Sequence, residues 1–351
     1  MTDSQLIVEA VAGDERAFAE LVAAHRRPLQ AHCYRVLGSL QDAEDAVQET
    51  LLRAWRNLSS FQRRSSLRTW LYTIATNVCL RAIERRPSRV LPIDYGPAAD
   101  PHEPLREPLL ESVWIEPYPD ERLGLDDGPT GPEARYEQRE SIELAFVAAL
   151  QLLPARQRAH ATMETRRPDR TQQATLRALG DDELRSIVAR YVEAWADNDV
   201  DALVGMLTDT ATLAMPPIPS WYRGREAIER VLGSLVFDGT RSWRMIPTAA
   251  NGQLAVGAYE LDSSGVYAPH GVTVLALRGA LIDEISHFRA PSMVERFGLP
   301  LQAAAGSSDG FDSQEDRDLR EPGARLGRAA RLGGAACAAC ARVRNRCPTR
   351  W

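Results

Sequence analysis

The sequence contains no lysine: all 42 Lys+Arg positions among its 351 residues are arginine. Lys and Arg replace one another at most surface positions, so this absence indicates a GC-rich gene and excludes no function. Long apolar runs are also absent. None reaches the roughly 18–20 residues of a membrane span, and Met1–Val11 has no basic flank before an apolar stretch. We therefore expect neither a membrane helix nor a signal peptide.

Cysteine is scarce, with five residues in the chain. Two stand alone in helical patterns, and three lie in the last 15 residues, at Cys337, Cys340 and Cys347. This is no disulfide framework and favours a reducing cytoplasm. Zinc needs four ligands, and no histidine lies near the three C-terminal cysteines, so we predict no metal and no cofactor. The net charge of −6 excludes a uniformly basic protein but allows a local basic patch.

Composition divides the chain into five parts. Residues 1–89 have helical patterns and almost no Gly or Pro. Residues 90–135 form a Pro-rich acidic linker, with 11 Asp/Glu against 3 Arg. Residues 136–178 begin as a helix, and residues 179–300 pass from helices to strand-like runs. Residues 301–351 have no usable periodicity, and we expect them to be disordered.

The first part predicts a helical bundle. Apolar residues recur at helical spacing up to Leu37, and we expect Pro28 to kink or break that helix. Ser39 caps a second helix, and a third helix runs from about Leu67 to Arg86, where a proline ends it.

Charge is divided unevenly between the second and third helices. The second helix carries acids on its outer face, whereas Phe61–Arg89 contains seven Arg and one acid, interleaved with aromatic, hydroxyl and amide side chains. Such a mixture suits single-stranded nucleic acid, because Arg pairs with phosphates and rings stack on bases. A solvated helix face is the alternative. The acidic linker could lie against this basic helix or form a solvated tether.

Two motifs in this part resemble a known family. Asp42–Trp55 (DAEDAVQETLLRAW) resembles region 2.2 of extracytoplasmic-function sigma factors, and Ser65–Asn77 (SSLRTWLYTIATN) resembles regions 2.3–2.4, in the family's order and spacing. The resemblance implies an RNA polymerase sigma factor that directs transcription initiation and performs no bond chemistry of its own. Its partners would be the clamp coiled coil of the polymerase core and the −10 element of promoter DNA.

The resemblance also assigns roles to individual residues. Four residues of the second helix would bind polymerase: Asp45, Gln48, Glu49 and Leu52. Ten residues of the following loop and helix would contact DNA: Arg63, Arg64, Ser65, Ser66, Thr69, Trp70, Tyr72, Asn77, Arg81 and Arg85. For the two aromatic residues, packing in the core is an equally open interpretation.

The family's second DNA-binding region is incomplete. Leu153–Arg158 (LPARQR) resembles the start of sigma region 4, whose helix-turn-helix reads the −35 element and needs roughly 30–40 residues. Here Arg158 is followed after one residue by His160–Pro168, which resembles the end of a recognition helix. We therefore predict truncated remnant helices of region 4 and the loss of −35 recognition. An inactive truncated sigma factor is the alternative.

Residues 179–300 resemble a SnoaL-like domain. Helical patterns are followed by strand-like runs at Gln253–Leu261, Gly271–Arg278 and Leu281–Arg289, which favour an α+β cone with a curved antiparallel sheet. The resemblance implies a pocket inside the cone. Our candidates for its lining are Trp221, Tyr222, Tyr259, His270 and His287.

Enzymes of this fold place an Asp/His pair in the pocket for acid–base chemistry, and Asp262 and Asp283 are the candidate acids here. The sigma-factor resemblance instead implies a regulatory domain that contacts the sigma core or senses a small-molecule ligand. A SnoaL-like isomerase, cyclase or hydrolase is the alternative to sigma-factor function.

Overall fold

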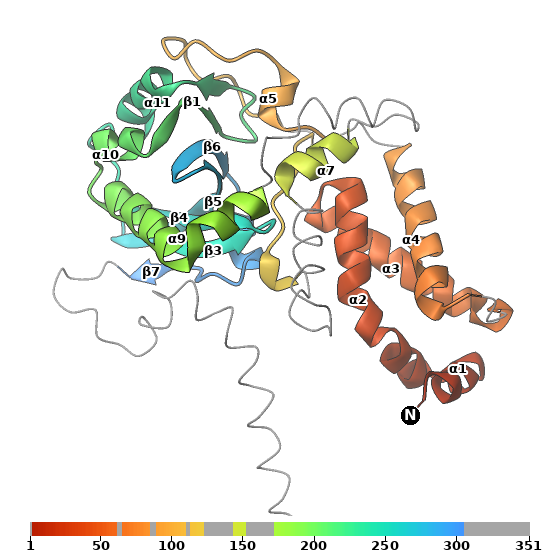
Figure 1. The fold of residues 1–351 in the computed structure, drawn as a ribbon. Helices are drawn as coiled ribbons and strands as arrows, with labels where there is room; N and C mark the ends of the chain where they lie inside the picture. The colour runs from red at the N-terminus through yellow and green to blue at the C-terminus, as the bar shows by residue number, and fades with distance from the viewer. Residues whose placement is uncertain are drawn as a thin grey trace, which may run out of the picture.

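The structure is a computed structural model that describes residues 2–61, 65–84, 89–109, 113–122, 143–151 and 172–304. Figure 1 shows two bodies, a helical bundle from the N-terminal part and a sheet flanked by helices from the C-terminal part. The expected order, an all-α bundle followed by an α+β domain, is confirmed. Among the described helices, none combines the length and apolarity of a membrane span. Residues 305–351 lie outside the described residues.

The bundle consists of α1 (Asp3–Val11), α2 (Glu15–Leu37), α3 (Leu40–Asn57), the 3-10 turn η1 (Leu58–Ser60) and α4 (Leu67–Ile83). Ser39 caps α3 as expected, because its hydroxyl accepts the Asp42 amide hydrogen at 3.2 Å. The sequence predicted a kink or a break at Pro28, and the break is wrong, since α2 continues through the proline. Leu29 and Cys33, just after the proline, are fully buried in the bundle core. This packing offsets the single backbone hydrogen bond that a helical proline removes.

The C-terminal body is built on one sheet. Its elements are α9 (Gln172–Ala196), α10 (Val200–Gly205), β1 (Leu207–Ala214), β2 (Trp221–Arg223), α11 (Arg225–Val231), the π-helical turn η3 (Leu232–Val236), β3 (Trp243–Ala250), β4 (Gln253–Leu261), β5 (Val266–Arg278), β6 (Leu281–Phe288), α12 (Pro291–Arg296) and β7 (Ala303–Ala304). The strand order is β2-β1-β6-β5-β4-β3, with β7 beside β5. Only the described pair β1–β6 is parallel, so the expected antiparallel pairing holds for the other pairs.

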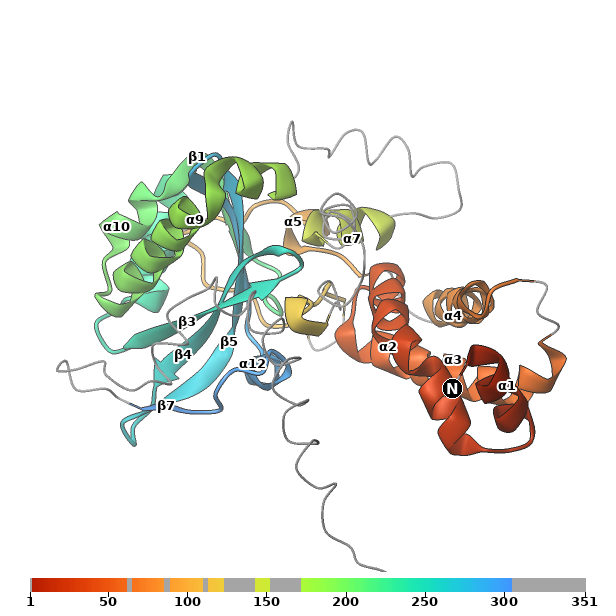
Figure 2. The ribbon, with the colours of Figure 1, turned by 60° about the horizontal axis from the view of Figure 1, so that its bottom comes forward.

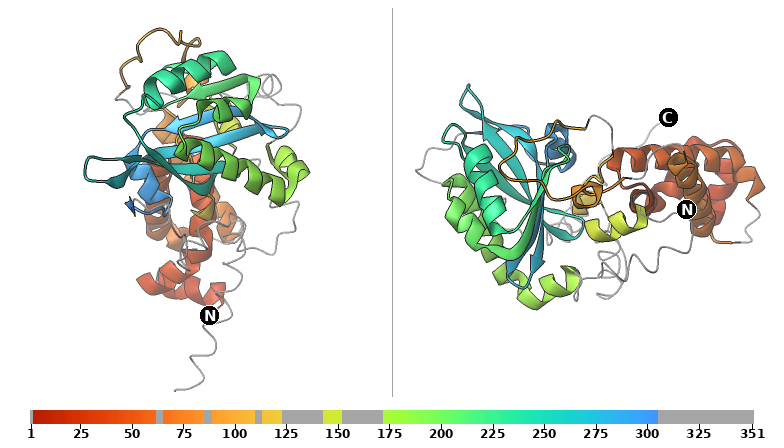
Figure 3. Two further views of the ribbon diagram at one scale, coloured as in Figure 1. Left: turned by 90° about the vertical axis from the view of Figure 1, so that its left-hand side faces the viewer. Right: turned by 90° about the horizontal axis from the view of Figure 1, so that it is seen from above.

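The two faces of the sheet have different cores. α9, α10 and α11 cover one face (Figure 2), and their apolar side chains form a cluster with Val256, Ala258 and Leu275. On the other face, Val272 and Val274 belong to the same hydrophobic cluster as the core of the bundle. Figure 3 shows the bundle on this side of the sheet. One continuous apolar core therefore joins the two bodies.

The described part of the acidic linker runs along the surface of the sheet domain. It contains the short helices α5 (Pro92–Tyr95) and η2 (Asp120–Arg122). The Ala99 amide donates to the Trp221 carbonyl at 2.8 Å, and the Trp221 indole donates to the Gly96 carbonyl at 2.8 Å. The Trp114 indole donates to the Pro217 carbonyl at 3.2 Å. Residues 96–109 therefore lie along the sheet domain rather than along the basic helix α4.

A buried hairpin turn joins the bundle, the linker and the sheet. Asn251 and Gly252 connect β3 to β4 with positive φ angles of 56° and 69°, which is typical of an Asn-Gly turn of type I′. Asn251 is fully buried. Its side-chain nitrogen donates to the Tyr34 hydroxyl of α2 at 2.8 Å, and its side-chain oxygen accepts from the Tyr118 amide at 2.8 Å. Tyr34 in turn donates to the Glu116 carbonyl at 2.7 Å.

The helix expected at the beginning of residues 136–178 is α7 (Leu144–Gln151), and it lies between the two bodies. The Gln253 side chain accepts from the Leu144 amide at 3.2 Å. At the other end of α7, the Gln151 side chain donates to the Val36 carbonyl in the last turn of α2 at 2.6 Å. Of the expected region 4 remnant, residues 136–142 and 152–171 lie outside the described residues, and residues 172–178 belong to α9.

We expect Asn251→Ala to lower the free energy of unfolding by about 2–4 kcal/mol. The change removes two buried hydrogen bonds and places alanine, which has no polar side chain to stabilise the left-handed conformation, at a positive φ. Urea unfolding followed by tryptophan fluorescence measures the change. Asn198 also has a positive φ, of 54°, but it is exposed. Asn198→Ala is therefore the control for backbone strain alone and should cost about 1 kcal/mol. Equal costs would contradict the joining role of Asn251.

Candidate functional site

α3 presents a continuous stripe of accessible side chains. Asp45, Gln48 and Leu52 are exposed, and Leu52 has 50% of its surface accessible. Glu49 is half-buried beside them and forms an ion pair with Arg53 at 2.6 Å. The spacing of these positions places them on one face of the helix. The structure thus brings together the four residues that the sequence proposed for polymerase binding.

A groove with a volume of about 350 Å³ runs between α3 and α4 beside this stripe. Both helices contribute charged walls, and small apolar side chains form the floor. Two polymerase candidates, Asp45 and Glu49, line the groove together with one DNA candidate, Arg81. The two candidate surfaces therefore meet at this groove.

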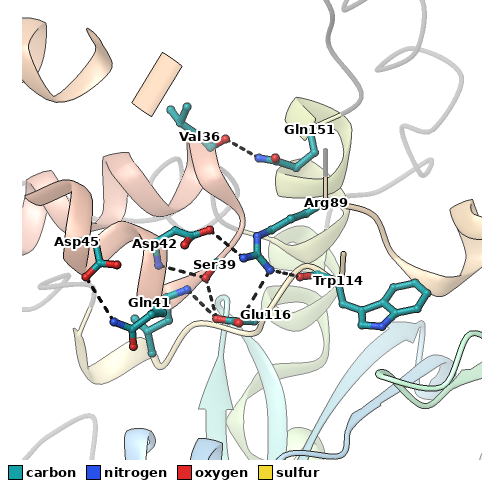
Figure 4. A network of polar contacts seen from close by, with 10 residues as sticks. Val36, Ser39, Gln41, Asp42, Asp45, Arg89, Trp114, Glu116 and Gln151 are labelled. Atoms are coloured by element: carbon teal, nitrogen blue, oxygen red, sulfur yellow. Dashed lines mark hydrogen bonds and ion pairs between the residues drawn. The ribbon is translucent and has the colours of Figure 1, made fainter. Parts of the chain in front are cut away.

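The linker helps to build the N-terminal end of α3 (Figure 4). The Glu116 carboxylate accepts from the Ser39 hydroxyl at 3.1 Å and from the Leu40 amide at 3.0 Å. An acid at this position pairs free amide groups of the first turn and interacts favourably with the helix dipole. The Glu116 amide also donates to the carbonyl of Gly38, the left-handed residue that ends α2.

Arg89, just after the last helix of the bundle, contacts both the first turn of α3 and the linker. It is buried, and its guanidinium donates to the Asp42 carboxylate at 2.8 Å and to the Trp114 carbonyl at 2.8 Å. Glu116 lies 4.0 Å from the same guanidinium. Neither Arg89 nor Glu116 was a candidate from the sequence, because no motif connects residues so far apart in the chain.

α4 presents the candidate DNA residues that the structure describes. Ser66 caps the helix, since its hydroxyl accepts from the Thr69 amide at 3.2 Å. Five of the candidates are exposed and accessible to phosphates and base edges: Ser65, Ser66, Thr69, Asn77 and Arg81. Three others lie outside the described residues: Arg63, Arg64 and Arg85.

The two aromatic candidates on α4 contact other side chains of the bundle. Trp70 is half-buried, and its ring centroid lies 5.0 Å from that of Phe61. Tyr72 contacts two side chains: the Arg68 guanidinium lies 5.4 Å from its ring centroid, and the His32 ring lies 5.0 Å away. These contacts match the packing interpretation of both aromatic residues.

The structure adds to this surface two arginines and a histidine, uncharged at pH 7, that the sequence reasoning missed. Arg68 is exposed and lies one helical turn before Tyr72, so the spacing of four could have indicated their contact. His32 and Arg35 reach the surface from α2, and no pattern in α4 indicates them. Burial lowers the pKa of both side chains, and Arg35 keeps its charge at pH 7 because the guanidinium pKa is intrinsically so high.

On the helix-covered side of the sheet, His270 and His287 form a hydrogen-bonded pair. The distance from His270 Nδ1 to His287 Nε2 is 2.9 Å, and His287 Nδ1 lies 2.8 Å from the Thr273 hydroxyl. The Trp243 ring packs edge-on against His270 at 5.0 Å. Burial lowers the pKa of His270 to about 4 and the pKa of His287 well below its usual range. Both rings are therefore neutral at pH 7.

The other pocket candidates are not brought to this pair. Tyr259 lies on the opposite face of the sheet, where its hydroxyl donates to the Pro300 carbonyl at 2.8 Å. Trp221 is buried and holds the linker through its indole nitrogen. Tyr222 is buried in the apolar cluster of the helix-covered face.

The two candidate acids are also engaged elsewhere. Asp283 accepts from the Thr208 hydroxyl at 2.6 Å and from Arg278 at 2.7 Å. Asp262 accepts from Ser264 within its own turn. These candidates therefore do not assemble the Asp/His pair that acid–base catalysis in this fold requires.

Comparison with known proteins matches both bodies. Residues 21–89 match the family model of Sigma-70 region 2, and residues 188–288 match that of the SnoaL-like domain. The ECF RNA polymerase sigma factor SigG of Mycobacterium tuberculosis is 37% identical over 324 residues, which cover 82% of this chain and 85% of that protein. Similarity to SigG therefore extends over both bodies.

Two further proteins are similar over parts of the chain. The ECF RNA polymerase sigma factor SigW of Bacillus subtilis is 40% identical over 74 residues, which cover 21% of this chain and 40% of that protein. The crystal structure of the extracytoplasmic-function sigma factor SigJ of Mycobacterium tuberculosis covers 79% of this chain and 98% of that chain, with a TM-score of 0.45 and 19% identity.

We expect the histidine pair to make stability depend on pH. The His270 pKa is about 4 in the folded protein and about 6.5 in an unfolded chain. Below about pH 6.5 the unfolded chain binds a proton that the folded protein excludes. The contribution of neutral His270 to the free energy of unfolding is therefore present above about pH 6.5 and is lost as the pH falls toward about 4. His270 alone accounts for about 2 kcal/mol between pH 7 and pH 5.

Urea unfolding at pH 7 and pH 5 measures this effect. His270→Gln cannot titrate, so it should reduce the pH dependence of the unfolding free energy by about 2 kcal/mol. The matched control is His102→Gln, at an exposed position of the linker. An unchanged pH dependence in His270→Gln would contradict the buried, neutral state of the pair.

Proposed function

The chain belongs to the extracytoplasmic-function (ECF) RNA polymerase sigma factors, and we propose how its accessible surfaces serve transcription initiation. α3 binds the clamp coiled coil of the polymerase core, while α4 and the loop before it hold the melted −10 element. Both sets of candidate residues lie on exposed faces of one bundle and meet at the groove between α3 and α4. This observation carries the proposal. The protein acts in the cytoplasm, with the polymerase.

The exposed stripe of α3 has the chemistry of a protein interface. Asp45 and Glu49 offer negative charge to a basic partner, and such complementarity guides association and fixes register. Leu52 keeps half of its surface accessible in the free chain. An apolar side chain among polar ones gains most from burial at the centre of an interface. These features support the docking of α3 on a partner helix pair.

The outer face of α4 has the chemistry of a DNA contact. Its exposed hydroxyl and amide groups can hydrogen-bond to bases, and Arg68 and Arg81 can pair with phosphates. Tyr72 supports Arg68 through the ring contact at 5.4 Å. We therefore assign Tyr72 to positioning and the exposed polar residues to contact.

We propose that −35 recognition is lost. The alignment with SigG spans 324 positions but takes 82% of the 351 residues of this chain, which is about 288 residues. About 36 aligned positions of SigG thus have no residue opposite them here, which matches the roughly 30–40 residues of a helix-turn-helix. The sequence favours a gap between Arg158 and His160, directly after the residues that resemble the start of region 4.

The SnoaL-like body has a regulatory role in this proposal. Its histidines pair with each other and with Thr273, and the candidate acids lie elsewhere. A small-molecule ligand near the histidines is part of the proposal, because the buried Tyr191 hydroxyl and Trp195 indole nitrogen can hydrogen-bond only to each other among the described residues, and Trp195 packs on Trp243, which packs on His270. A ligand with an acceptor group would take the hydrogen bond that the Tyr191 hydroxyl can still donate.

Reversing the charge of the α3 stripe should weaken polymerase binding. We expect Asp45→Arg combined with Glu49→Arg to raise the Kd for purified core polymerase by at least about tenfold, because acidic groups that face a basic partner become repulsive. Fluorescence anisotropy of the labelled full-length chain measures the Kd.

The matched control is Glu9→Arg combined with Glu20→Arg. It makes the same change in net charge at exposed positions of α1 and α2, away from the stripe. The proposal predicts that this variant binds like the wild type. A wild-type chain that does not bind core polymerase, or an equal loss in both variants, would contradict the assignment of the stripe.

Run-off transcription tests the loss of −35 recognition. With core polymerase and a promoter that carries both elements, we expect weak initiation that disappears when the −10 element is replaced. Replacing the −35 element should change the yield by less than about twofold, because no helix-turn-helix reads it. Robust initiation that falls when the −35 element is altered would show that the chain retains this contact.

A further inference from the structure

We infer that the bundle binds polymerase while the linker and the SnoaL-like body are docked on it, with Glu116 and Arg89 as positioning residues of α3. This inference rests on the proposed role of α3. Docking then stabilises the N-terminal end of α3, the polymerase-binding helix. Initiation requires no release of the C-terminal body.

The polar contacts that hold α3 from the linker and from α12 end in its first turns. Glu116 caps Ser39 and Leu40, and Arg89 pairs with Asp42. Two more contacts follow on the same end of the helix. They are Arg122 with Glu44 at 2.7 Å and Arg296 with Gln41 at 2.9 Å.

The proposed binding surfaces begin where these contacts stop. Asp45 is the next residue after Glu44, and from there the stripe to Leu52 is accessible in the docked chain. α4 lies on the side of the bundle away from the sheet domain in Figures 1 and 2. Docking therefore leaves both the polymerase stripe and the DNA face uncovered.

Release of the C-terminal body would carry a large cost. Ile115 and Tyr118 are fully buried in the cluster that joins the two bodies. Undocking would also break the contacts of Asn251 with Tyr34 and Tyr118. Removing Trp114 and Glu116 would leave the buried Arg89 with fewer partners, which is strongly unfavourable for a buried charge. The docked arrangement is therefore the dominant form of the free chain.

α7 adds a second connection between the bodies. Its first amide is held by Gln253 of β4, and its last residue, Gln151, is bonded to the end of α2. The helix just before Leu153–Arg158, the residues that resemble the start of region 4, thus spans the interface. In this chain α7 therefore connects the two bodies in the docked form.

A reversible cross-link tests whether the docked form binds polymerase. Glu44→Cys and Arg122→Cys place thiols on α3 and the linker, at a pair that lines a groove with Gln30 of α2 and Gln48 of the stripe. The same chain with both thiols capped by N-ethylmaleimide is therefore the control for added bulk beside the stripe. A bis-maleimide with a disulfide in its spacer joins them in the full chain. Cys337, Cys340 and Cys347 are replaced by Ser to avoid side reactions, whereas Cys33 and Cys79 are buried.

The Kd for core polymerase is measured for the cross-linked chain and again after reduction of the spacer. We expect the two values to agree within about twofold. A tenfold or greater loss on cross-linking, restored by reduction, would overturn the inference and show that the linker must leave α3. The uncross-linked double-cysteine chain is the reference. If this chain and the wild type both fail to bind, the proposed function itself fails.

Variants of Glu116 test its positioning role. Loss of a helix cap costs about a fivefold change in an equilibrium constant, so Glu116→Ala should raise the Kd for core polymerase by about that factor. Glu116→Gln keeps an acceptor oxygen and should recover most of the loss. Glu103→Ala, at an exposed linker position, is the control. Wild-type binding by Glu116→Ala would contradict the role.

Discussion

Arg89 follows the last helix of the bundle and carries its charge into a site where only 6% of the residue is exposed. A buried guanidinium needs partners for its charge and its N–H groups. Asp42 on α3 and the Trp114 carbonyl on the linker supply them, and the Glu116 carboxylate lies nearby. The linker must therefore return to α3 after it has crossed the sheet domain. That path brings the Asn251 turn against Tyr34 and so fixes the two bodies together.

The packing of the two bodies against each other determines how the SnoaL-like body could regulate the bundle. In a tethered pair, the SnoaL-like body could regulate only by moving onto or off the sigma surface. Here it shares a continuous apolar core with the bundle, and its linker supplies the cap of α3. A ligand that altered the packing around β3 and β4 would reach α3 through Asn251, Tyr34 and Glu116, which form one chain of hydrogen bonds.

The sequence predicted the parts of the site that local periodicity determines. Ser39 was predicted as a cap from local pattern, whereas the resemblance to sigma region 2.2 assigned the residues of the stripe from Asp45 to Leu52, and helical spacing places them on one face. It did not predict the linker path, because a Pro-rich acidic segment has the composition of a tether. Nor did it predict that Asn251 would be buried, since Asn-Gly turns usually mark exposed hairpins.

Physical causes explain why the sequence did not predict some parts of the sheet correctly. β3 was missed because Pro247 lies within it, and proline is compatible with a strand chiefly at a sheet edge, where β3 is found. Tyr259 was grouped with the histidines, but it follows a register shift between Ala258 and Tyr259 that alternation alone does not reveal. Short strands such as β2, with three residues, carry too little pattern to be recognised.

Site-specific photo-cross-linking from Leu52 tests the central claim most directly. A photoreactive amino acid at this position, in the full chain mixed with core polymerase, should label the subunit that carries the clamp coiled coil. The same amino acid at Glu229, on α11 of the SnoaL-like body, serves as the comparison and should label that subunit weakly. No adduct from position 52, or stronger labelling from position 229, would contradict the account of α3 as the polymerase-binding helix.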